Sequence, residues 1–450
     1  HIGRPITAVF FLCFISSHLT YMWADAYFYN PITSQKANFP LSYPMTAKSF
    51  MEKHGLLDRE EYLERLEANK ENVNLVSYPL EKIQYNRRSA VLNILLVSVN
   101  NLRADALNST AMPSSYAYAQ QSINFTNHYS SSNDMFGIFG LFYGLPSSYA
   151  SSIKAQGSSA VLLDVLKHHN YTLAAFSGDD FDDALYPEVI FRGRDALPDQ
   201  ATDDDQSAIQ AWSEWLQSPQ ANSPWFNFIE LTTLDNFSSY ETDVTLTTAE
   251  RFTADYQKST QAADVQLAKI FAELERLDLQ DNTVVIITSN HGTEFNETKT
   301  NSWGANSNYS RYQLQVPLFI KWPGKSASEY THRSSHLDVS VTLMQELLGV
   351  SSNPTDFSSG RSLFDERRRK WILAGDSREL ALVTDQQTTV LDKFGNYKLY
   401  DQNYKRLKDV SPRLPVLMQG LTELQRFYTK NDQMIIKKKR EANGFPFLLP

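Results

Sequence analysis

The sequence predicts an α/β fold: a doubly wound sheet with helices on both faces, followed by a small antiparallel subdomain. Three observations favour it. Apolar runs of strand length recur along the chain, helical stretches separate them, and residues 91–99 are almost continuously apolar, as in a strand buried on both faces. At 450 residues and 42% hydrophobic content, the chain is long enough to build one large core.

The amino-terminal stretch has the pattern of a membrane helix, which we expect over residues 1–24. Residues 6–22 are largely apolar, with Arg4 before them and several aromatic residues after them. Because no Lys or Arg follows until Lys36, the amino end is expected in the cytoplasm and the rest outside it. A secretory signal cleaved after residues 24–26 is the alternative. Since the chain starts with His1 rather than Met, further membrane helices are expected before it.

Residues 25–90 are expected to form a connector with two short helices rather than a second core. The first helix would be capped by Thr46 and end at Gly55, and the second would begin at Asp58 with a capping-box-like start. Directly after a membrane helix, the first of these segments is expected near the lipid surface. A solvated tether is the alternative.

The globular domain is expected over residues 91–432, with a basic flexible tail over residues 433–450. Further strands are predicted at residues 171–176, 225–231, 283–288 and 316–322, and helices at residues 159–168, 248–277 and 337–348. After Trp371, short alternating segments with a turn at Gly395 and Asn396 predict the antiparallel subdomain. A last helix is predicted near residues 414–428.

Composition excludes two kinds of partner or site. The net charge of -9 repels nucleic-acid phosphates, and no basic stripe interleaved with aromatic residues compensates for it. The single cysteine, Cys13, lies in the apolar amino-terminal stretch. The globular part therefore has neither an internal disulfide nor a thiolate metal site.

Three places near the carboxyl ends of the predicted strands are where reactive groups of an open sheet gather. They hold Asn100, the run of residues 131–134, and the pair Asn290 and His291. Hydrolases of phosphate and sulfate esters need a carboxylate after the first strand, a hydroxyl nucleophile at a helix start, and Asp-His after a later strand. These anionic oxygens hold the metal that stabilises the developing charge.

Five stretches resemble, in the same order, the landmarks of the sulfatase/alkaline-phosphatase superfamily: LLVSVNNLRAD, FGIFGLFYGLPSSY, NTVVIITSNHG, LQVPLFIKWPG and HLDVSVTLMQELLGV. With the connector PITSQKANFPLSYPMTAKSFMEKHGLLDREEY, they are similar to the YejM/PbgA family of Gram-negative inner-membrane proteins, and the resemblance covers residues 6–430. It implies a polytopic membrane domain before His1 and a sulfatase-like domain in the periplasm. It also implies a role in lipopolysaccharide control, through sensing of lipid A and contact with an inner-membrane regulatory protein of lipid A synthesis.

The family's lipid contact carries over to Met45, Thr46, Ala47 and Lys48. Relatives have two basic residues in a row where this chain has Lys48 and Ser49, so the charge that this segment contributes to a phosphate contact is weaker. Backbone amides at the helix start around Thr46 would still favour a phosphate, since that end carries partial positive charge.

Residue by residue, the superfamily's metal site is degraded in this sequence. Asn100 stands in place of the first metal-binding carboxylate, Asn290 replaces the aspartate of the Asp-His pair, and only His291 remains. Asp134 falls about where the nucleophilic hydroxyl would be. No strong metal or cofactor is therefore expected, which leaves room only for weak divalent binding. The sulfatase signature Cys/Ser-x-Pro-x-Arg is absent, which excludes an ordinary sulfatase.

Two further patterns are interpreted structurally. His332 and His336 have ligand-like spacing but fit the start of the helix at residue 337 better. Gly137, Gly140 and Gly144 are too widely spaced for a nucleotide loop and are expected to allow close helix packing.

Three functional hypotheses follow. The first is a non-enzymatic regulator of outer-membrane lipid homeostasis that binds lipid A or another anionic lipid. The second is a weak metal-dependent phosphatase or phosphoethanolamine transferase that uses Asp134, His291 and either Ser131 or Ser132. The third is a protein that binds and transports cardiolipin.

Overall fold

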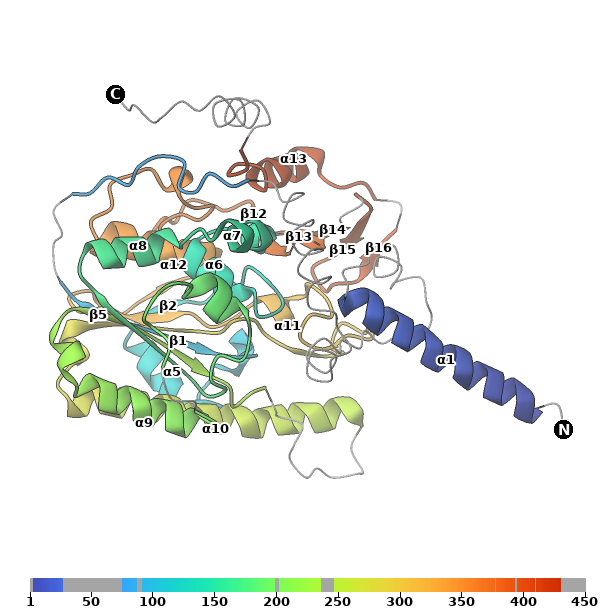
Figure 1. Cartoon of the computed structure of the whole chain (residues 1–450), viewed down its shortest axis with the longest axis horizontal. Helices are drawn as coiled ribbons and strands as arrows, with labels where there is room; N and C mark the ends of the chain where they lie inside the picture. Colours follow the sequence, from blue (N-terminus) through green and yellow to red (C-terminus); the bar gives the residue numbers. More distant parts are fainter. Residues whose placement is uncertain are drawn as a thin grey trace. The chain divides into compact units, whose positions relative to one another are not determined.

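The computed structural model describes residues 3–26, 75–86, 91–198, 202–235, 247–376, 378–392, 395–408 and 410–429. The chain divides into two compact units, His1–Asn74 and Leu75–Pro450 (Figure 1), and each is treated by itself. The connector helices predicted between residues 46 and 66 and the tail predicted over residues 433–450 lie outside the described residues.

The first unit contains a single described helix, α1 (Gly3–Ala26), where a helix is predicted. Apolar side chains on it are exposed, among them Leu12 at 68%. His18 and Thr20 turn back onto the helix's own carbonyl oxygens, 2.9 and 2.8 Å away. No helix in the described parts of the chain is both long enough and apolar enough to cross a membrane.

The second unit is built on a seven-stranded sheet in the order β10-β2-β9-β6-β1-β5-β4. β1 (Asn93–Val99) lies between β5 (Trp225–Leu231) and β6 (Thr283–Thr288), and β4 (Thr172–Ser177) pairs with β5. These four strands are parallel and confirm four predicted strands. Every residue of β1 is buried, as a strand covered on both faces requires.

The sheet is mixed rather than all parallel. The run at residues 316–322 forms β9 (Phe319–Lys321), but β9 lies antiparallel to both β6 and β2 (Ile123–Phe125). An apolar run indicates burial and does not indicate direction, so the sequence could not show this. β2 and the edge strand β10 (Ser328–Tyr330) have only three residues each and give no periodic signal.

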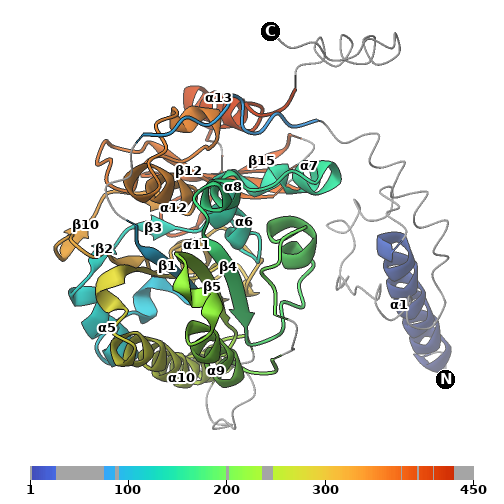
Figure 2. The same cartoon turned by 60° about the vertical axis from the view of Figure 1, so that its left-hand side comes forward.

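Helices cover both faces of this sheet (Figure 2). On one face α6 (Gly137–Tyr143), α7 (Ala150–Gln156), α8 (Val161–His168) and α12 (Leu337–Thr342) pack with Ile94 and Leu96 of β1. On the other, α5 (Pro113–Gln120), α9 (Asp205–Leu216) and α10 (Thr248–Arg276) pack with Leu95 and Val97. Alternate residues of one strand therefore serve two cores, which confirms the doubly wound arrangement.

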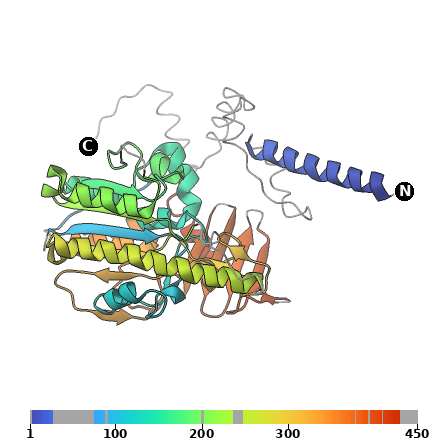
Figure 3. The same ribbon diagram turned by 90° about the horizontal axis from the view of Figure 1, so that it is seen from below.

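The predicted helices are present with small changes at their ends. α10 begins at a capping box in which the side chains of Thr247 and Glu250 accept hydrogen bonds from each other's backbone amides. The helix runs over one face of the sheet, roughly parallel to the strands (Figure 3). The helix predicted at residues 337–348 ends at Thr342 and continues as a π-helical turn, η8 (Leu343–Leu347).

The predicted antiparallel subdomain is a five-stranded sheet that ends in a helix. It consists of β12 (Trp371–Gly375), β13 (Glu379–Thr384), β14 (Thr388–Asp392), β15 (Tyr397–Tyr400), β16 (Arg406–Leu407) and then α13 (Leu414–Glu423). Gly395 has a φ of +84°, which fits the predicted Gly-Asn turn.

The remaining elements are short. Two-residue ladders join β3 (His128–Tyr129) to β11 (Ser334–Ser335) and β7 (Glu294–Phe295) to β8 (Trp303–Gly304), and α11 (Arg311–Leu314) precedes β9. The single-turn helices are η2 (Ala104–Ala106), η3 (Ser147–Tyr149), η4 (Tyr186–Ile190), η5 (Pro219–Asn222), η7 (Gln280–Asn282) and η9 (Pro354–Asp356).

Residues 75–86 belong to the globular unit and not to the connector expected over residues 25–90. Val76 is buried and bridges to Tyr428 near the end of the described chain, and Tyr85 bridges to Val350. The Tyr78 hydroxyl donates to the carbonyl of Tyr143 at 2.7 Å. Because these contacts lie far apart in sequence, composition alone could not place this boundary.

Candidate functional site

The four predicted pocket residues come together at the carboxyl ends of the central strands. Asn100 follows β1, Asn290 and His291 follow β6, and Asp134 lies in the loop between β3 and α6. The two strand ends are joined directly, because the backbone amide of Asn101 donates to Asn290 Oδ1 at 3.0 Å. The strand ends that carry Asn100 and Asn290 therefore lie side by side.

Asn100 is oriented by carboxylates that the sequence does not single out. Its Nδ2 donates to Glu230 Oε1 at 3.3 Å and to Asp235 Oδ2 at 3.0 Å, while its Oδ1 is buried without a hydrogen-bond partner. The amide therefore turns its nitrogen toward the neighbouring acids. Burial raises the pKa of Asp235 to about 6, against the opposing effect of this hydrogen bond.

Glu230, the next-to-last residue of β5, is fully buried. Burial, together with the charge of Asp179, raises the pKa of Glu230 to about 8. Its Oε1 accepts from the Tyr186 hydroxyl at 2.5 Å, and its Oε2 lies 2.7 Å from Ser177 Oγ. The only signal in the sequence is a single acid inside the apolar run WFNFIEL. At neutral pH Glu230 is therefore largely protonated.

Asn290 and His291 are held by the loop in which they lie. Asn290 Oδ1 accepts from the backbone amides of Asn101 and His291, at 3.0 and 2.7 Å. His291 Nδ1 lies 2.7 Å from the carbonyl oxygen of Gly292, so Nδ1 carries the proton and Nε2 the lone pair. Burial lowers the pKa of His291, which keeps the ring neutral. His291 Nε2 is therefore the nitrogen of this ring that could bind a ligand, and the residue before it is an amide, Asn290, where an Asp-His pair would have a carboxylate.

Asp134 organises the turn that leads into α6. Its Oδ1 accepts from Ser132 Oγ at 2.7 Å and from the backbone amide of Phe136 at 3.0 Å, and its Oδ2 lies 3.9 Å from Arg378 Nη2. Asp134 is therefore a partly exposed carboxylate with local hydrogen bonds. Among the described residues, no three His, Cys, Asp or Glu side chains are arranged to hold a metal ion.

A buried histidine pair supports the loop that carries His291. His336 precedes α12 directly, as expected, and its Nδ1 lies 2.9 Å from Nε2 of His128, not beside His332. His336 Nε2 donates to the carbonyl of Ser289 at 2.8 Å, so His128 donates to His336 and accepts from Ser334 Oγ at 2.9 Å. Burial lowers the pKa of His336 to about 3 and the pKa of His128 well below its ordinary value.

Acid should therefore lower the free energy of unfolding at pH values where the folded protein still keeps both histidines neutral. Because the folded pKa of His336 lies below the ordinary value of 6.5, its contribution to stability is present above that pH and is lost as pH falls. At about pH 5 the loss from His336 should be about 2 kcal/mol. In urea unfolding, His336→Gln should depend less on acid than the unsubstituted chain, since an amide can replace both hydrogen bonds. His168→Gln, at an exposed histidine, is the matched control, and an equal change in both variants would contradict the assignment.

The predicted lipid contacts Met45, Thr46, Ala47 and Lys48 lie outside the described residues. Gly137 and Gly140 confirm the expected close packing, because a Cβ on Gly137 would lie 1.8 Å from the carbonyl oxygen of Asn290 and one on Gly140 would lie 2.0 Å from Ser131 Oγ. Gly137 thus places the start of α6 directly against the loop that carries Asn290.

Solved structures with the same arrangement define the class of protein. The chain is similar in fold to a protein in the alkaline phosphatase superfamily from Vibrio parahaemolyticus, with a TM-score of 0.57, 14% identity, and coverage of 83% of this chain and 98% of that one. The lipoteichoic acid synthase LtaP from Listeria monocytogenes gives a TM-score of 0.54 at 14% identity, with 85% and 99% covered. The fold is therefore of the alkaline-phosphatase/sulfatase type, which confirms the predicted class.

Sequence comparisons identify the family within that class. The family model described as Sulfatase matches residues 92–350, and a domain of unknown function, DUF3413, matches residues 1–85. The inner membrane protein YejM of Salmonella typhi is 39% identical over 432 residues, which cover 95% of this chain and 71% of that one. An uncharacterized protein of Haemophilus influenzae is 36% identical over 419 residues, covering 92% and 68%. The chain belongs to the YejM family of sulfatase-like proteins.

Proposed function

We propose that this chain is a non-catalytic regulator at the Gram-negative inner membrane, with its globular unit in the periplasm. It senses lipid A or another anionic lipid at the periplasmic leaflet through Met45 to Lys48. One observation carries the non-catalytic part: the two amides that replace metal-binding carboxylates are already engaged in the protein's own hydrogen bonds, Asn100 with Glu230 and Asp235, and Asn290 with two backbone amides.

The charges around the four candidate residues support this proposal. Hydrolysis of an anionic ester needs a cation, or several positive donors, where negative charge develops. Here Asp134 and Asp235 contribute negative charge, Asn100 donates its amide hydrogens to Glu230 and Asp235, and His291 is neutral. An anionic ester would therefore meet repulsion at the position where a phosphatase binds it.

The membrane location and the lipid rest on the relatives and on the connector sequence. The Salmonella typhi relative is named an inner membrane protein. Lys48 supplies one positive charge, and the helix start that the sequence predicts at Thr46 would supply backbone donors, the chemistry that a lipid phosphate needs. Occupancy by the lipid would alter contact with an inner-membrane regulatory protein of lipid A synthesis.

Binding to vesicles tests the sensing role on the full chain. Lys48→Glu should weaken binding to phosphatidylethanolamine vesicles that contain lipid A by about tenfold, because it replaces attraction to phosphate with repulsion. Lys269→Glu, an exposed charge reversal on α10, is the matched control and should leave binding unchanged. Equal effects of the two variants would remove the case for a specific contact at Lys48. If Lys48→Glu weakens binding only to vesicles that contain cardiolipin in place of lipid A, the transport alternative is supported instead.

One observation favours the enzyme alternative: Ser132 Oγ lies 2.7 Å from Asp134, the geometry of a hydroxyl and its base. Elemental analysis and a phosphomonoesterase assay with added magnesium, manganese or zinc decide between the two. The regulator predicts no stoichiometric ion and no turnover. Turnover that is lost in both Asp134→Ala and His291→Ala would overturn the proposal and make Asn100 and Asn290 neutral ligands.

A further inference from the structure

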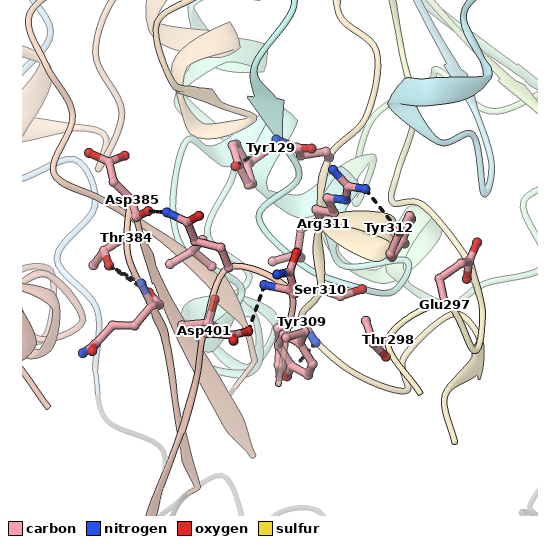
Figure 4. A pocket seen from close by; sticks show the side chains of 18 of the residues that line it. Tyr129, Glu297, Thr298, Tyr309, Ser310, Arg311, Tyr312, Thr384, Asp385 and Asp401 are labelled. Atoms are coloured by element: carbon pink, nitrogen blue, oxygen red, sulfur yellow. Dashed lines mark hydrogen bonds between the residues drawn. The ribbon is translucent and has the colours of Figure 1, made fainter. Parts of the chain in front are cut away.

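A pocket lies away from the four site residues, between the main sheet's loops and the carboxyl-terminal sheet. Its volume is about 290 Å³, at the small end of the range for small-molecule sites. One wall comes from β3, the loop after β7 and the residues around α11, and the other from the β13–β14 turn and the β15–β16 turn (Figure 4). None of Asn100, Asp134, Asn290 and His291 lines it.

The lining is rich in rings and planar polar groups and poor in aliphatic side chains. Four tyrosines line it: Tyr129, Tyr309, Tyr312 and Tyr404. Four side-chain amides line it as well: Gln315, Gln387, Gln402 and Asn403. Leu314 and Val383 are the aliphatic residues, so the pocket lacks the continuous apolar wall that an acyl chain requires.

The charges in the lining do not favour an anion. Two arginines, Arg311 and Arg333, face three carboxylates, Glu297, Asp385 and Asp401. Arg333 pairs with Asp385 at 2.7 Å, and Arg311 stacks on the ring of Tyr312, 4.9 Å from its centroid. The positive charge is thus balanced within the wall, and a phosphate or sulfate would meet as much repulsion as attraction.

Arg333 is a buried structural part of this wall. Its side chain is 10% exposed, its guanidinium lies 5.5 Å from the centroid of the Tyr129 ring, and its Nε and Nη1 have no hydrogen-bond partner in the described structure. Because these two nitrogens are fully buried, an occupant of the pocket does not reach them, and the groups open to it are the tyrosine rings and the side-chain amides.

We propose that this pocket binds a saccharide unit. A sugar ring combines an apolar C–H face, which fits flat against tyrosine rings, with hydroxyls that both donate and accept. The side-chain amides of Gln387 and Asn403 match those hydroxyls because each carries two donors and an acceptor in one plane. Gln315 and Gln402 already donate to neighbouring groups of the protein. The occupant is either a free sugar or the sugar of a glycolipid, and this site is independent of the lipid contact proposed at Met45 to Lys48.

Saturation-transfer NMR on the full chain tests the proposal. The probes are D-glucose, D-galactose, N-acetyl-D-glucosamine and the disaccharides maltose and lactose. We expect at least one of them to bind, and Gln387→Ala to weaken that binding by about tenfold, as loss of a paired polar contact does. The control is Gln386→Ala, because Gln386 lies in the same turn but does not line this pocket.

Further measurements separate a loss of binding from a loss of folding, and a free sugar from a lipid-linked one. If Gln387→Ala lowers the unfolding temperature, Asn403→Ala in the opposite turn replaces it. Vesicles of phosphatidylethanolamine with and without monoglucosyl diacylglycerol distinguish a lipid-linked sugar from a free one, and preference for either supports the site. The proposal is overturned if no probe, free or lipid-linked, binds, if both glutamine variants behave alike, or if inorganic phosphate binds with the same dependence on Gln387 while sugars do not.

Discussion

Glu230→Gln should make the globular unit more stable than the unsubstituted chain at alkaline pH, by about 4 kcal/mol. The folded pKa of Glu230, about 8, lies above the ordinary 4.5. The stability tied to its proton is therefore present below pH 4.5 and is lost as pH rises toward 8. Glutamine keeps the neutral form at every pH, so urea unfolding of the variant should lose this alkaline decline.

The local hydrogen bonds show why glutamine fits. Ser177 Oγ lies 2.6 Å from Asp179 and 2.7 Å from Glu230 Oε2, but it has one proton. A protonated Glu230 donates to Ser177, which donates to Asp179, and a glutamine Nε2 can make the same donation. Glu214→Gln on the exposed face of α9 is the control and should keep the alkaline decline. A Glu230→Gln variant that is less stable than the unsubstituted chain at pH about 9 would show that the buried group is ionised instead.

Gly137→Ala should destabilise the globular unit by at least about 3 kcal/mol, because overpacking against a fixed backbone leaves no room to relax. The new Cβ would lie 1.8 Å from the carbonyl oxygen of Asn290 and 2.5 Å from Ser130 Oγ. The start of α6 or the loop carrying His291 must then move. Denaturant unfolding measures the loss, and the ring signals of His291 report the displacement.

Gly193→Ala separates steric overlap from backbone strain. Gly193 has a φ of +66° and no atom within 4 Å of an added Cβ, so its replacement should cost only about 1 kcal/mol of strain. If the two alanine variants lose the same stability, close packing at Gly137 is not the cause.

Strands and helices of the central sheet could be predicted because burial on both faces leaves a direct mark on sequence. Residues 225–231 read as a strand and are one, β5. The direction of β9 and the short strands β2 and β10 could not be predicted, since direction and edge pairing depend on contacts far along the chain. The same limit applies to residues 75–86, whose partners are Tyr428 and Val350.

The candidate site could be predicted from strand ends, which placed Asn100, Asp134, Asn290 and His291 together. Its electrostatics could not. Glu230 and Asp235 orient Asn100 because they are buried and lie within hydrogen-bond distance of it. Neither burial nor this distance can be predicted from neighbouring residues in the sequence. The histidine partner of His336 is likewise His128, far away in sequence, while the nearby His332 packs against the rings of Phe125 and Tyr330.

The bridge between Val76 and Tyr428 fastens the incoming chain to the last described segment. Backbone hydrogen bonds from the Ser77 amide to the Phe427 carbonyl and from the Thr429 amide to the Leu75 carbonyl reinforce this bridge. The Tyr149 ring contacts the ring of Phe427, and its hydroxyl accepts a hydrogen bond from the Phe427 amide. A mechanical pull applied through the segment before residue 75 would act first on the contacts with Phe427, Tyr428 and Thr429 and only afterwards on the sheet. Truncations intended to shorten the protein at either end should therefore keep residues 75–86 and 410–429 together or remove both.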